Sequence, residues 1–464
     1  MNSLSDAIIA KDKAACEYFL RQGADVNALD EYGFTPLIET AIVNDQDLFD
    51  LVLSSGAKVN EQDLNGNTPL HWAVENANEY MIDQLLKHKA NPNLYNKSGQ
   101  SVLTIAFMRQ QERLKKKLYK SGADLNFTKD FINTKLLGHR FELVGRVDIV
   151  DTKGLFVEIN YEGFFLEFSI ALIRNALSEF RQHFIAKSLR KYDKQLNEVV
   201  HALSTSAHLA QYIQYQTHDS KRKAIIKNML ANDLLQIIPI AHNGHALTFI
   251  KYKAYLIISD RQQDLRLVNT LGVYQIDNPK AWNASLLYEL IYVKKPRTYF
   301  EKRFFSILSL KLHNKIIMRS QISGNCSWAN VEASIPSALY LLMRETDVSS
   351  EPVVGFSHPA LDIFLKWQAW DKSRELQFCI DSFKTASPAA KASKAALLAA
   401  IFFQRLNAKI PKDVALAKRI LPILETPGYE YVLESYKDVY CRYMPYRSGK
   451  NLMALIEATR DELL

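Results

Sequence analysis

Apolar and polar positions follow different patterns in successive parts of the chain. Residues 141–161 alternate around Asp151-Thr152-Lys153-Gly154, which predicts a β-hairpin. Residues 164–235 have helical periodicity with few helix breakers. The next segment predicts four strands, at 237–241, 246–250, 255–259 and 266–270. The C-terminal part predicts a series of helices, at 359–370, 373–384, 391–406, 412–424, 429–443 and 450–463.

Residues 1–130 contain an internal repeat with a constant interval between its copies. A Gly-Ala-Asp-x-Asn signature begins at Gly23 and Gly122, and variants of it begin at Gly56, with Lys58 in place of Asp, and at Lys89, so that the four copies are evenly spaced. A second signature, Thr-Pro-Leu, begins at Thr35 and Thr68 and is degraded to Ser-Val-Leu at the next equivalent position. Two signatures in the same phase predict a stack of four similar helical units.

These repeats resemble the ankyrin repeat, whose Thr-Pro-Leu-His-x-Ala signature is complete from Thr68 to Ala73. The resemblance covers residues 1–130 and implies an all-α solenoid that binds a protein partner. It points to the hairpin tips and the first-helix face as the contact surface, with four candidate residues: Tyr32, Asn65, Trp72 and Tyr95. For Trp72, packing between repeats is the alternative interpretation.

Charge and composition narrow the classes of partner and ligand. Residues 1–130 contain 14 Lys and Arg against 18 Asp and Glu, a net charge of −4, so the rest of the chain carries +12. This excess suits nucleic acid or a ribonucleoprotein, an anionic membrane surface or an acidic protein, and charge alone leaves these partners open.

The sequence has no run of 18 apolar residues, so no membrane span is predicted. Four scattered cysteines favour a reducing compartment and predict neither a disulfide framework nor a metal site, and no cofactor is expected.

One histidine and one aspartate occupy the two ends of a predicted hairpin. If strands 246–250 and 255–259 meet at a symmetric turn at Tyr252-Lys253, residue i pairs with residue 505 − i. His245 then pairs with Asp260, with Cβ atoms about 5 Å apart. A carboxylate at that distance can orient an imidazole, as general-base catalysis requires. Asn269 is the alternative partner if the register differs.

A cysteine at a predicted helix start supplies the third element. A strand at 315–319 leads through Ser323-Gly324-Asn325 into a helix that begins near Cys326 and that Pro336 must end or kink. Amide N–H groups at a helix start lower the pKa of a thiol and favour the reactive thiolate. Gln321 carries a side-chain amide that suits stabilisation of an oxyanion. The other three cysteines are expected to be small buried apolar residues.

The chain order His245, Asp260, Gln321, Cys326 resembles the ubiquitin-like-protease superfamily, which includes SUMO proteases, the adenoviral proteinase and YopJ-type effectors. The resemblance implies a general base, an orienting acid, an oxyanion donor and a nucleophile, in that order. Gln321 lies five residues before Cys326 rather than about six, and Ser327-Trp328 stand where those proteases usually have Gly. The Asn-Cys-x-Trp-Ala segment is similar to papain-like proteases instead, so we expect a cysteine-protease-like domain of either kind.

Together the predictions describe a multidomain chain. An all-α ankyrin-repeat solenoid (1–130) precedes an α+β cysteine-protease-like domain (131–350) and an all-α C-terminal region (351–464). This layout resembles the ankyrin effectors that Legionella and related intracellular bacteria inject into host cells, which implies type IV secretion and action in the host cytoplasm or nucleus. Two functions remain open. One is thiol hydrolase or acyltransferase chemistry on a host protein, at a peptide or isopeptide bond; the other is a non-catalytic scaffold that occupies a host protein or ribonucleoprotein.

Overall fold

The computed structural model describes residues 3–161, 163–213, 219–232, 234–242, 245–261, 269–321, 324–344, 353–354, 358–442 and 447–460. The chain divides into two compact units. The repeat unit comprises Met1–Leu136, Gly145–Asn160 and Cys379–Leu464. The sheet unit comprises Leu137–Val144 and Tyr161–Phe378. The domain limits expected at residues 130 and 350 remain a prediction.

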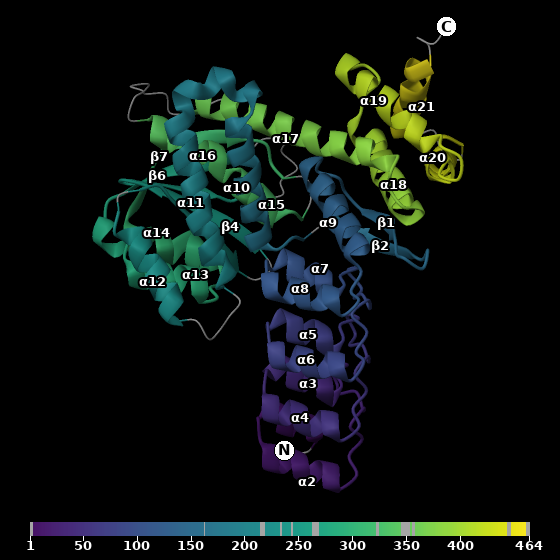
Figure 1. Ribbon diagram of the computed structural model, residues 1–464. Helices are drawn as coiled ribbons and strands as arrows, with labels where there is room; N and C mark the ends of the chain where they lie inside the picture. The colour runs from purple at the N-terminus through teal and green to yellow at the C-terminus, as the bar shows by residue number, and fades with distance from the viewer. Residues whose placement is uncertain are drawn as a thin grey trace. The chain divides into compact units, whose positions relative to one another are not determined.

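Four helix pairs form the stack at the start of the repeat unit (Figure 1). The second and third pairs begin at Thr35 and Thr68, whose hydroxyls accept the N–H of Ile38 and His71, and the fourth begins at Ser101 in the same way. Side-chain caps satisfy amides that an isolated helix leaves unpaired. The predicted helical solenoid is confirmed, and its helices are α1 (Leu4–Ile9), α2 (Lys13–Arg21), α3 (Pro36–Val43), α4 (Gln46–Ser54), α5 (Pro69–Glu75), α6 (Glu79–Lys87), α7 (Val102–Met108) and α8 (Glu112–Lys120).

The repeated asparagine has a structural role. The Oδ1 atoms of Asn27, Asn60 and Asn93 each accept a backbone N–H from the next repeat at 2.8 Å, from Lys58, Asn91 and Asp124. We call these contacts the asparagine staples. Lys89 replaces the usual glycine and adopts the left-handed conformation with a φ of 64°, so the turn keeps its shape without glycine. The signature therefore encodes contacts between repeats.

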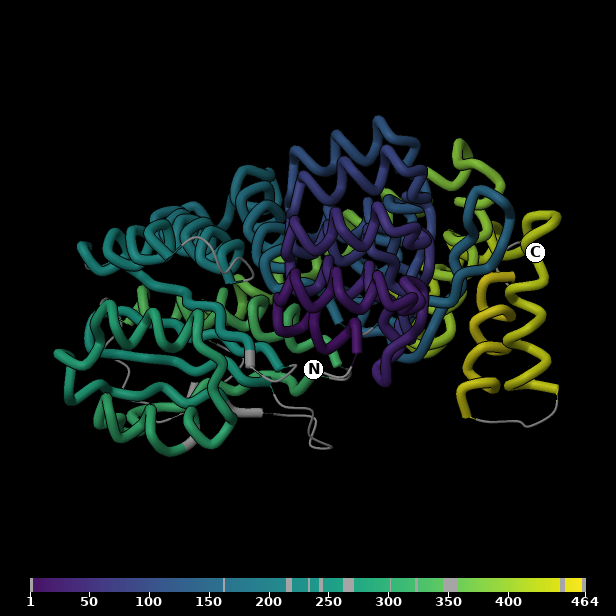
Figure 2. Tube along the Cα trace, turned by 90° about the horizontal axis from the view of Figure 1, so that it is seen from below, coloured from purple at the N-terminus to yellow at the C-terminus, as the bar shows by residue number. Residues whose placement is uncertain are grey.

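The rest of the repeat unit comes from distant parts of the chain. Helix α9 (Leu125–Arg140) begins in this unit, and the predicted hairpin forms between β1 (Arg146–Val150) and β2 (Phe156–Asn160). The Val150 N–H donates to Ser393 Oγ of α18 at 2.9 Å, which fixes the hairpin to the C-terminal helices. Figures 1 and 2 show the hairpin beside α18. The C-terminal elements are α18 (Pro388–Arg405), α19 (Pro411–Leu424), α20 (Tyr431–Lys437), a π-helical turn (Asp438–Arg442) and α21 (Arg447–Arg460).

One predicted helix boundary is wrong. The segments expected at 359–370 and 373–384 form a single helix, α17 (Pro359–Phe383). The short polar stretch between them contains neither Gly nor Pro, so nothing in it breaks the helix. Asp371, in that stretch, is buried and pairs with Arg140 Nε at 2.6 Å. Asp371, which the sequence pattern places between two helices, therefore belongs to a buried ion pair inside the sheet unit.

The sheet unit is built on a six-stranded sheet in the order β3-β4-β5-β6-β7-β8. Neighbouring strands are antiparallel except for the parallel pair β7 and β8. The strands are β3 (Gln236–His242), β4 (His245–Tyr252), β5 (Tyr255–Ser259), β6 (Asn269–Ile276), β7 (Leu310–Met318) and β8 (Val353–Val354). Strands form at the first three predicted positions, and β6 shares residues 269–270 with the fourth prediction, whose residues 266–268 lie outside the described residues. The α+β character of this region is confirmed.

Helices cover both faces of this sheet. On one face, Ile238, Phe249 and Leu256 pack with α13 and α14 in an apolar core. On the other, Ser259 Oγ donates to the carbonyl oxygen of Asn330 in α15, and α16 packs against β4 and β5. The helices are α10 (Leu166–Gln182), α11 (Asp193–Gln211), α12 (Asp219–Leu230), α13 (Ala284–Tyr292), α14 (Phe304–Leu308), α15 (Cys326–Glu332) and α16 (Ser334–Met343), with short 3₁₀ or π segments at Phe184–Tyr192, Pro279–Ala281 and Tyr299–Arg303.

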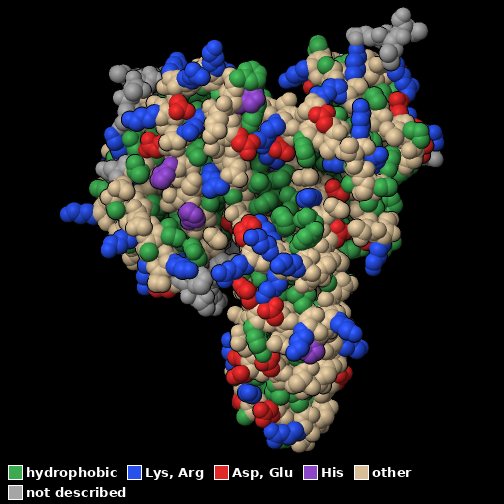
Figure 3. All heavy atoms as spheres, in the orientation of Figure 1, with side chains coloured by type: hydrophobic (Ala, Val, Ile, Leu, Met, Phe, Trp, Pro, Cys, Tyr) green, Lys and Arg blue, Asp and Glu red, His purple; other side chains and the backbone are tan. Residues whose placement is uncertain are grey.

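Two surface properties bear on the partner predictions. Within the described residues, no helix combines the length and the apolar character needed to cross a bilayer. On the face shown in Figure 3, Lys and Arg side chains are spread among Asp and Glu side chains. A nucleic-acid or ribonucleoprotein partner therefore remains a prediction from net charge alone.

Candidate active site

Cys326 is the first residue of α15, as predicted. The helix stops at Glu332 and the chain resumes as α16, in which Pro336 is the third residue. Proline lacks an N–H and is tolerated in a first helical turn but not in an interior, so the break before Ser334 follows from the sequence. The Cys326 side chain is partly exposed, and its Sγ accepts the backbone N–H of Ala246 at 3.3 Å. The nucleophile candidate thus contacts the start of β4.

His245 and Asp260 meet, although the predicted register is wrong by two residues. The structure pairs Tyr252 with Tyr255, so the turn is Lys253-Ala254 and not Tyr252-Lys253. Lys253 adopts the left-handed conformation that this tight turn requires, with a φ of 50°. A shift of two residues conserves the alternation of side chains along a strand. His245 Nε2 lies 2.8 Å from Asp260 Oδ1.

The histidine and the cysteine form a coupled pair. The hydrogen bonds to Asp260 and to Cys326 raise the pKa of His245 to about 9, against the opposing effect of burial. Burial opposes ionisation of the Cys326 thiol, but hydrogen bonds from His245 and from the Ala246 and Ser327 amides lower its pKa overall. Between the lowered thiol pKa and about pH 9 the arrangement therefore favours a thiolate beside an imidazolium, the reactive form of a catalytic cysteine.

Asn330 lies one turn after Cys326 in α15 and connects this helix to the chain beside His245 and beside Asp260. Its side chain is fully buried, its Nδ2 donates to the carbonyl oxygen of Ala246 at 2.6 Å, and its Oδ1 accepts the N–H of Arg261 at 2.6 Å. Ala246 follows His245 and Arg261 follows Asp260 in the chain. Asn330 was not among the residues predicted for the site. Its partners are 69 to 84 residues away in the chain, so no local pattern in the sequence marks it.

A second group of residues supports α15 from behind. The Trp328 ring stacks on His139 with a centroid separation of 6.0 Å and an interplanar angle of 10°. The Arg140 guanidinium lies 5.2 Å from the centre of the Trp328 ring and is itself paired with Asp371 of α17. Because these side chains are buried, the position of the cysteine depends on a chain of contacts that extends to α17.

The predicted oxyanion donor is close in sequence but is not joined to the thiol in the described structure. Gln321 is buried with 6% of its surface exposed, and its Oε1 has no hydrogen-bond partner among the described atoms. No described hydrogen bond connects Gln321 with Cys326. Its role in oxyanion stabilisation therefore remains a prediction. The side chain of the alternative partner, Asn269, lies outside the described residues.

The other cysteines have different surroundings. Cys16 and Cys379 are buried, and burial raises the pKa of Cys16 to about 11. Cys441 is partly exposed, and burial raises its pKa as well. The surroundings of Cys326, in contrast, lower its thiol pKa. In the same part, no cluster of three or more His, Cys, Asp or Glu side chains has the geometry to hold a metal ion.

The four candidate contact residues of the repeats fall into two groups. Tyr32 is 60% exposed and Asn65 is exposed, as a partner surface requires. Trp72 is partly buried, with its Nε1 donating to Asp63 Oδ2 at 3.0 Å and its ring edge-on to Phe34. Tyr95 stacks on Phe127 at 5.9 Å. Trp72 and Tyr95 thus have packing roles within the stack, and the partner role of all four residues remains a prediction.

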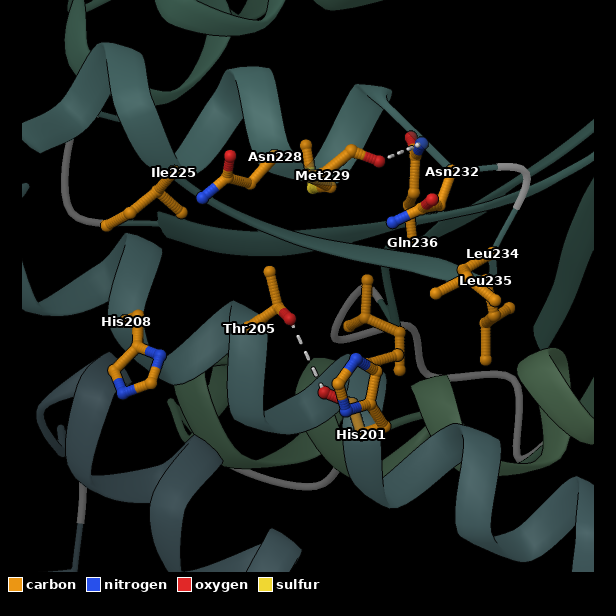
Figure 4. A pocket seen from close by; sticks show the side chains of 12 residues that line it. His201, Thr205, His208, Ile225, Asn228, Met229, Asn232, Leu234, Leu235 and Gln236 are labelled. Carbon is orange, nitrogen blue, oxygen red and sulfur yellow. Dashed lines mark hydrogen bonds between the residues drawn. The ribbon is translucent and has the colours of Figure 1, made fainter.

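A separate cavity of about 290 Å³ lies elsewhere in the sheet unit, between α11, α12 and the start of β3. Figure 4 shows His201, Thr205 and His208 on one side of it and Ile225, Asn228 and Met229 on the other. The Gln236 amide donates to the Met229 carbonyl oxygen at 3.3 Å. Cys326, His245 and Asp260 are not among the residues that line this cavity.

Comparison with known proteins agrees with this architecture. A family model of ankyrin repeats, in three copies, matches residues 41–129. The solved structure of the Legionella effector AnkH is similar over 99% of this chain and 97% of that one, with 36% sequence identity and a TM-score of 0.78. No curated protein matches the chain. Identity of this level over the whole length means that the chain belongs to the family of the ankyrin-repeat effector AnkH.

Proposed function

We propose that this protein acts inside a host cell as an effector that attacks a carbonyl group of a host protein through Cys326. The observation that carries the proposal is the contact of one imidazole with both Asp260 and a thiol of lowered pKa. Entry by type IV secretion and action in the host cytoplasm or nucleus are part of the proposal. They are supported by the relationship to AnkH.

The reaction begins at the sulfur. The Cys326 thiolate attacks the carbonyl carbon of a peptide or isopeptide bond, and a C–S bond forms. His245, protonated at the start, gives its proton to the departing amine as the C–N bond breaks. Asp260 holds the ring through Nε2, which leaves Nδ1 for the proton exchange, and stabilises the imidazolium. Gln321 and the Cys326 backbone N–H are the proposed oxyanion donors.

The resulting thioester has two fates. Water attacks it in a hydrolase, with His245 taking the proton from the water and returning it to the sulfur. In an acyltransferase, an amine or hydroxyl group of a second substrate takes the place of water. The repeat unit brings the host protein to the reaction, with Tyr32 and Asn65 on its exposed surface.

The thiol chemistry can be tested without a known substrate. We expect iodoacetamide to modify Cys326 at a lower pH than Cys441 in the same sample, because hydrogen bonds lower the pKa of Cys326 and burial raises that of Cys441. His245→Ala removes the hydrogen bond that lowers the Cys326 pKa, so the Cys326 profile shifts to higher pH. Peptide mass spectrometry between pH 5 and 9 measures the rate at each cysteine.

The internal reference makes this test decisive. The Cys441 rate should be the same in wild type and His245→Ala, which shows that the reagent behaves equally in both samples, and circular dichroism checks that the variant is folded. A Cys326 profile that matches that of Cys441 in the wild-type protein contradicts the enzyme proposal. The non-catalytic scaffold is then the better account.

A further inference from the structure

The repeat unit contains a groove whose lining includes neither Cys326 nor the four candidate contact residues of the ankyrin repeats. It has a volume of about 670 Å³ and lies between the start of α9, the turn of the β1–β2 hairpin, the start of α18 and the segment before α20. All four segments belong to the repeat unit. The hairpin and α18 lie side by side in both Figure 1 and Figure 2, and we call the space between these elements the hairpin groove.

Aromatic side chains make up much of its apolar lining. Phe127, Phe156, Tyr429 and Tyr431 all line the groove. Phe156 is 62% exposed and Tyr431 is 45% exposed, so both rings remain accessible to a ligand. Aromatic faces carry negative electrostatic potential and attract ammonium and guanidinium groups. An exposed aromatic wall of this kind suits a cation better than an anion.

The charged lining has the same preference. Asp124, Asp130 and Asp151 line the groove, and Lys153 is the one cation among its described lining residues. Asp124 and Asp151 each use one carboxylate oxygen to cap local backbone amides. Asp130 makes no hydrogen bond to any described residue, and burial raises its pKa to about 6 against the opposing charge of Lys394. A half-buried carboxylate with no hydrogen-bond partner gains most from a cation that enters the groove.

We propose that the hairpin groove binds an extended segment of a partner protein through a lysine or arginine side chain, which pairs with Asp130 and lies against Phe156 and Tyr431. The charge of the lining selects a cationic occupant. The volume exceeds what one side chain fills, so the flanking residues of the segment also find room in the groove. The groove is a binding site separate from Cys326 and does not depend on its chemistry.

A labelled basic peptide tests this assignment. The probe is fluorescein-Gly-Lys-Gly-Arg-Gly-Lys-Gly, with a Glu-containing peptide of the same length as its charge control. We expect fluorescence anisotropy to show saturable binding of the basic peptide to the full-length protein and none of the acidic one. Asp130→Asn should weaken binding about fivefold, as loss of a partly buried ion pair does, and Phe156→Ala about threefold, as loss of one cation–π contact does.

Matched variants distinguish the groove from general attraction by the acidic repeats. Glu457→Gln removes an exposed carboxylate of α21 outside the groove and should leave the affinity unchanged. Circular dichroism of each variant checks that the fold is retained. Equal affinities for wild type, Asp130→Asn and Phe156→Ala would overturn the proposal, because any binding would then be non-specific. Failure to bind the peptide at all would overturn it too, without bearing on Cys326.

Discussion

At the scale of single residues, the sequence pattern indicates the candidate residues of the site but not the contacts that hold them in place. His245, Asp260 and Cys326 were identified because each lies at the end of a predicted element, where functional side chains can meet. Asn330 lies inside a helix whose apolar pattern masks it. Its three hydrogen bonds, to Ala246, Arg261 and Ser259, depend on contacts between residues up to 84 positions apart. No local pattern in a single sequence reports such contacts.

Asn330 is a positioning residue by this argument, and Asn330→Leu tests it. Leucine keeps the volume but removes both side-chain hydrogen bonds, so we expect the free energy of unfolding to fall by about 1–3 kcal/mol. We also expect the alkylation profile of Cys326 to shift to higher pH, and at a pH below the thiol pKa the rate falls about tenfold for each unit by which that pKa rises. Thermal unfolding and the iodoacetamide rate measure the two effects.

Ser334→Ala is the matched control for Asn330. Ser334 is equally buried, and its Oγ donates to the Val331 carbonyl oxygen at 2.6 Å. We expect this variant to lower stability without moving the alkylation profile. If both variants shift the profile by the same amount, Asn330 has a structural role only.

At the scale of elements, helices with local start signals were predicted well and long-range ion pairs were not. Thr35 and Thr68 mark helix starts in the sequence and cap helices in the structure. The helix expected at 391–406 begins three residues earlier, at Pro388. The polar stretch around Asp371 instead reads as a loop because its partner, Arg140, is 231 residues away. The predicted register of the hairpin from β4 to β5 was wrong because the sequence does not mark the position of its turn. Lysine at a left-handed turn position carries no sequence signal of the kind that Asn or Gly gives.

The ion pair between Arg140 and Asp371 predicts a large effect on α17 and the sheet unit. Asp371→Ala leaves the buried Arg140 guanidinium without its nearest carboxylate, so we expect a loss of about 3–5 kcal/mol in the free energy of unfolding. Asp362→Ala on the same helix removes an exposed pair with Lys366 and should cost less than about 1 kcal/mol. Urea denaturation compares the two, and equal losses would contradict the assignment of Asp371 to the core.

At the scale of the whole molecule, the order of architectures was predictable and the grouping of segments was not. The even spacing of the repeated signatures and the changes between helical and strand patterns indicated the solenoid, the α+β region and the helical C-terminal region. The β1–β2 hairpin and the helices after Cys379 nevertheless group with the repeats. Contacts such as Val150 with Ser393 join residues 243 positions apart, and nothing in the spacing of either segment encodes them.

The enzyme and scaffold accounts differ in which surface matters to a cell. If the protein is an enzyme, Cys326→Ala abolishes its effect in cells. If it is a scaffold, the effect survives Cys326→Ala and is lost in the double variant Tyr32→Ala and Asn65→Ala, since both of these side chains are exposed. Comparison of cells that express each variant at equal levels separates the two accounts. Loss of the effect in both variants is expected if the repeats deliver the substrate.

The asparagine staples have a consequence for how such proteins change over evolutionary time. Each staple joins only neighbouring repeats, with the same geometry at 2.8 Å. Duplication or deletion of one inner repeat therefore recreates the same junction between its neighbours. A lineage can lengthen or shorten its recognition surface in single genetic steps while the residues around the thiol stay unaltered. We therefore expect related proteins to differ in their number of repeats.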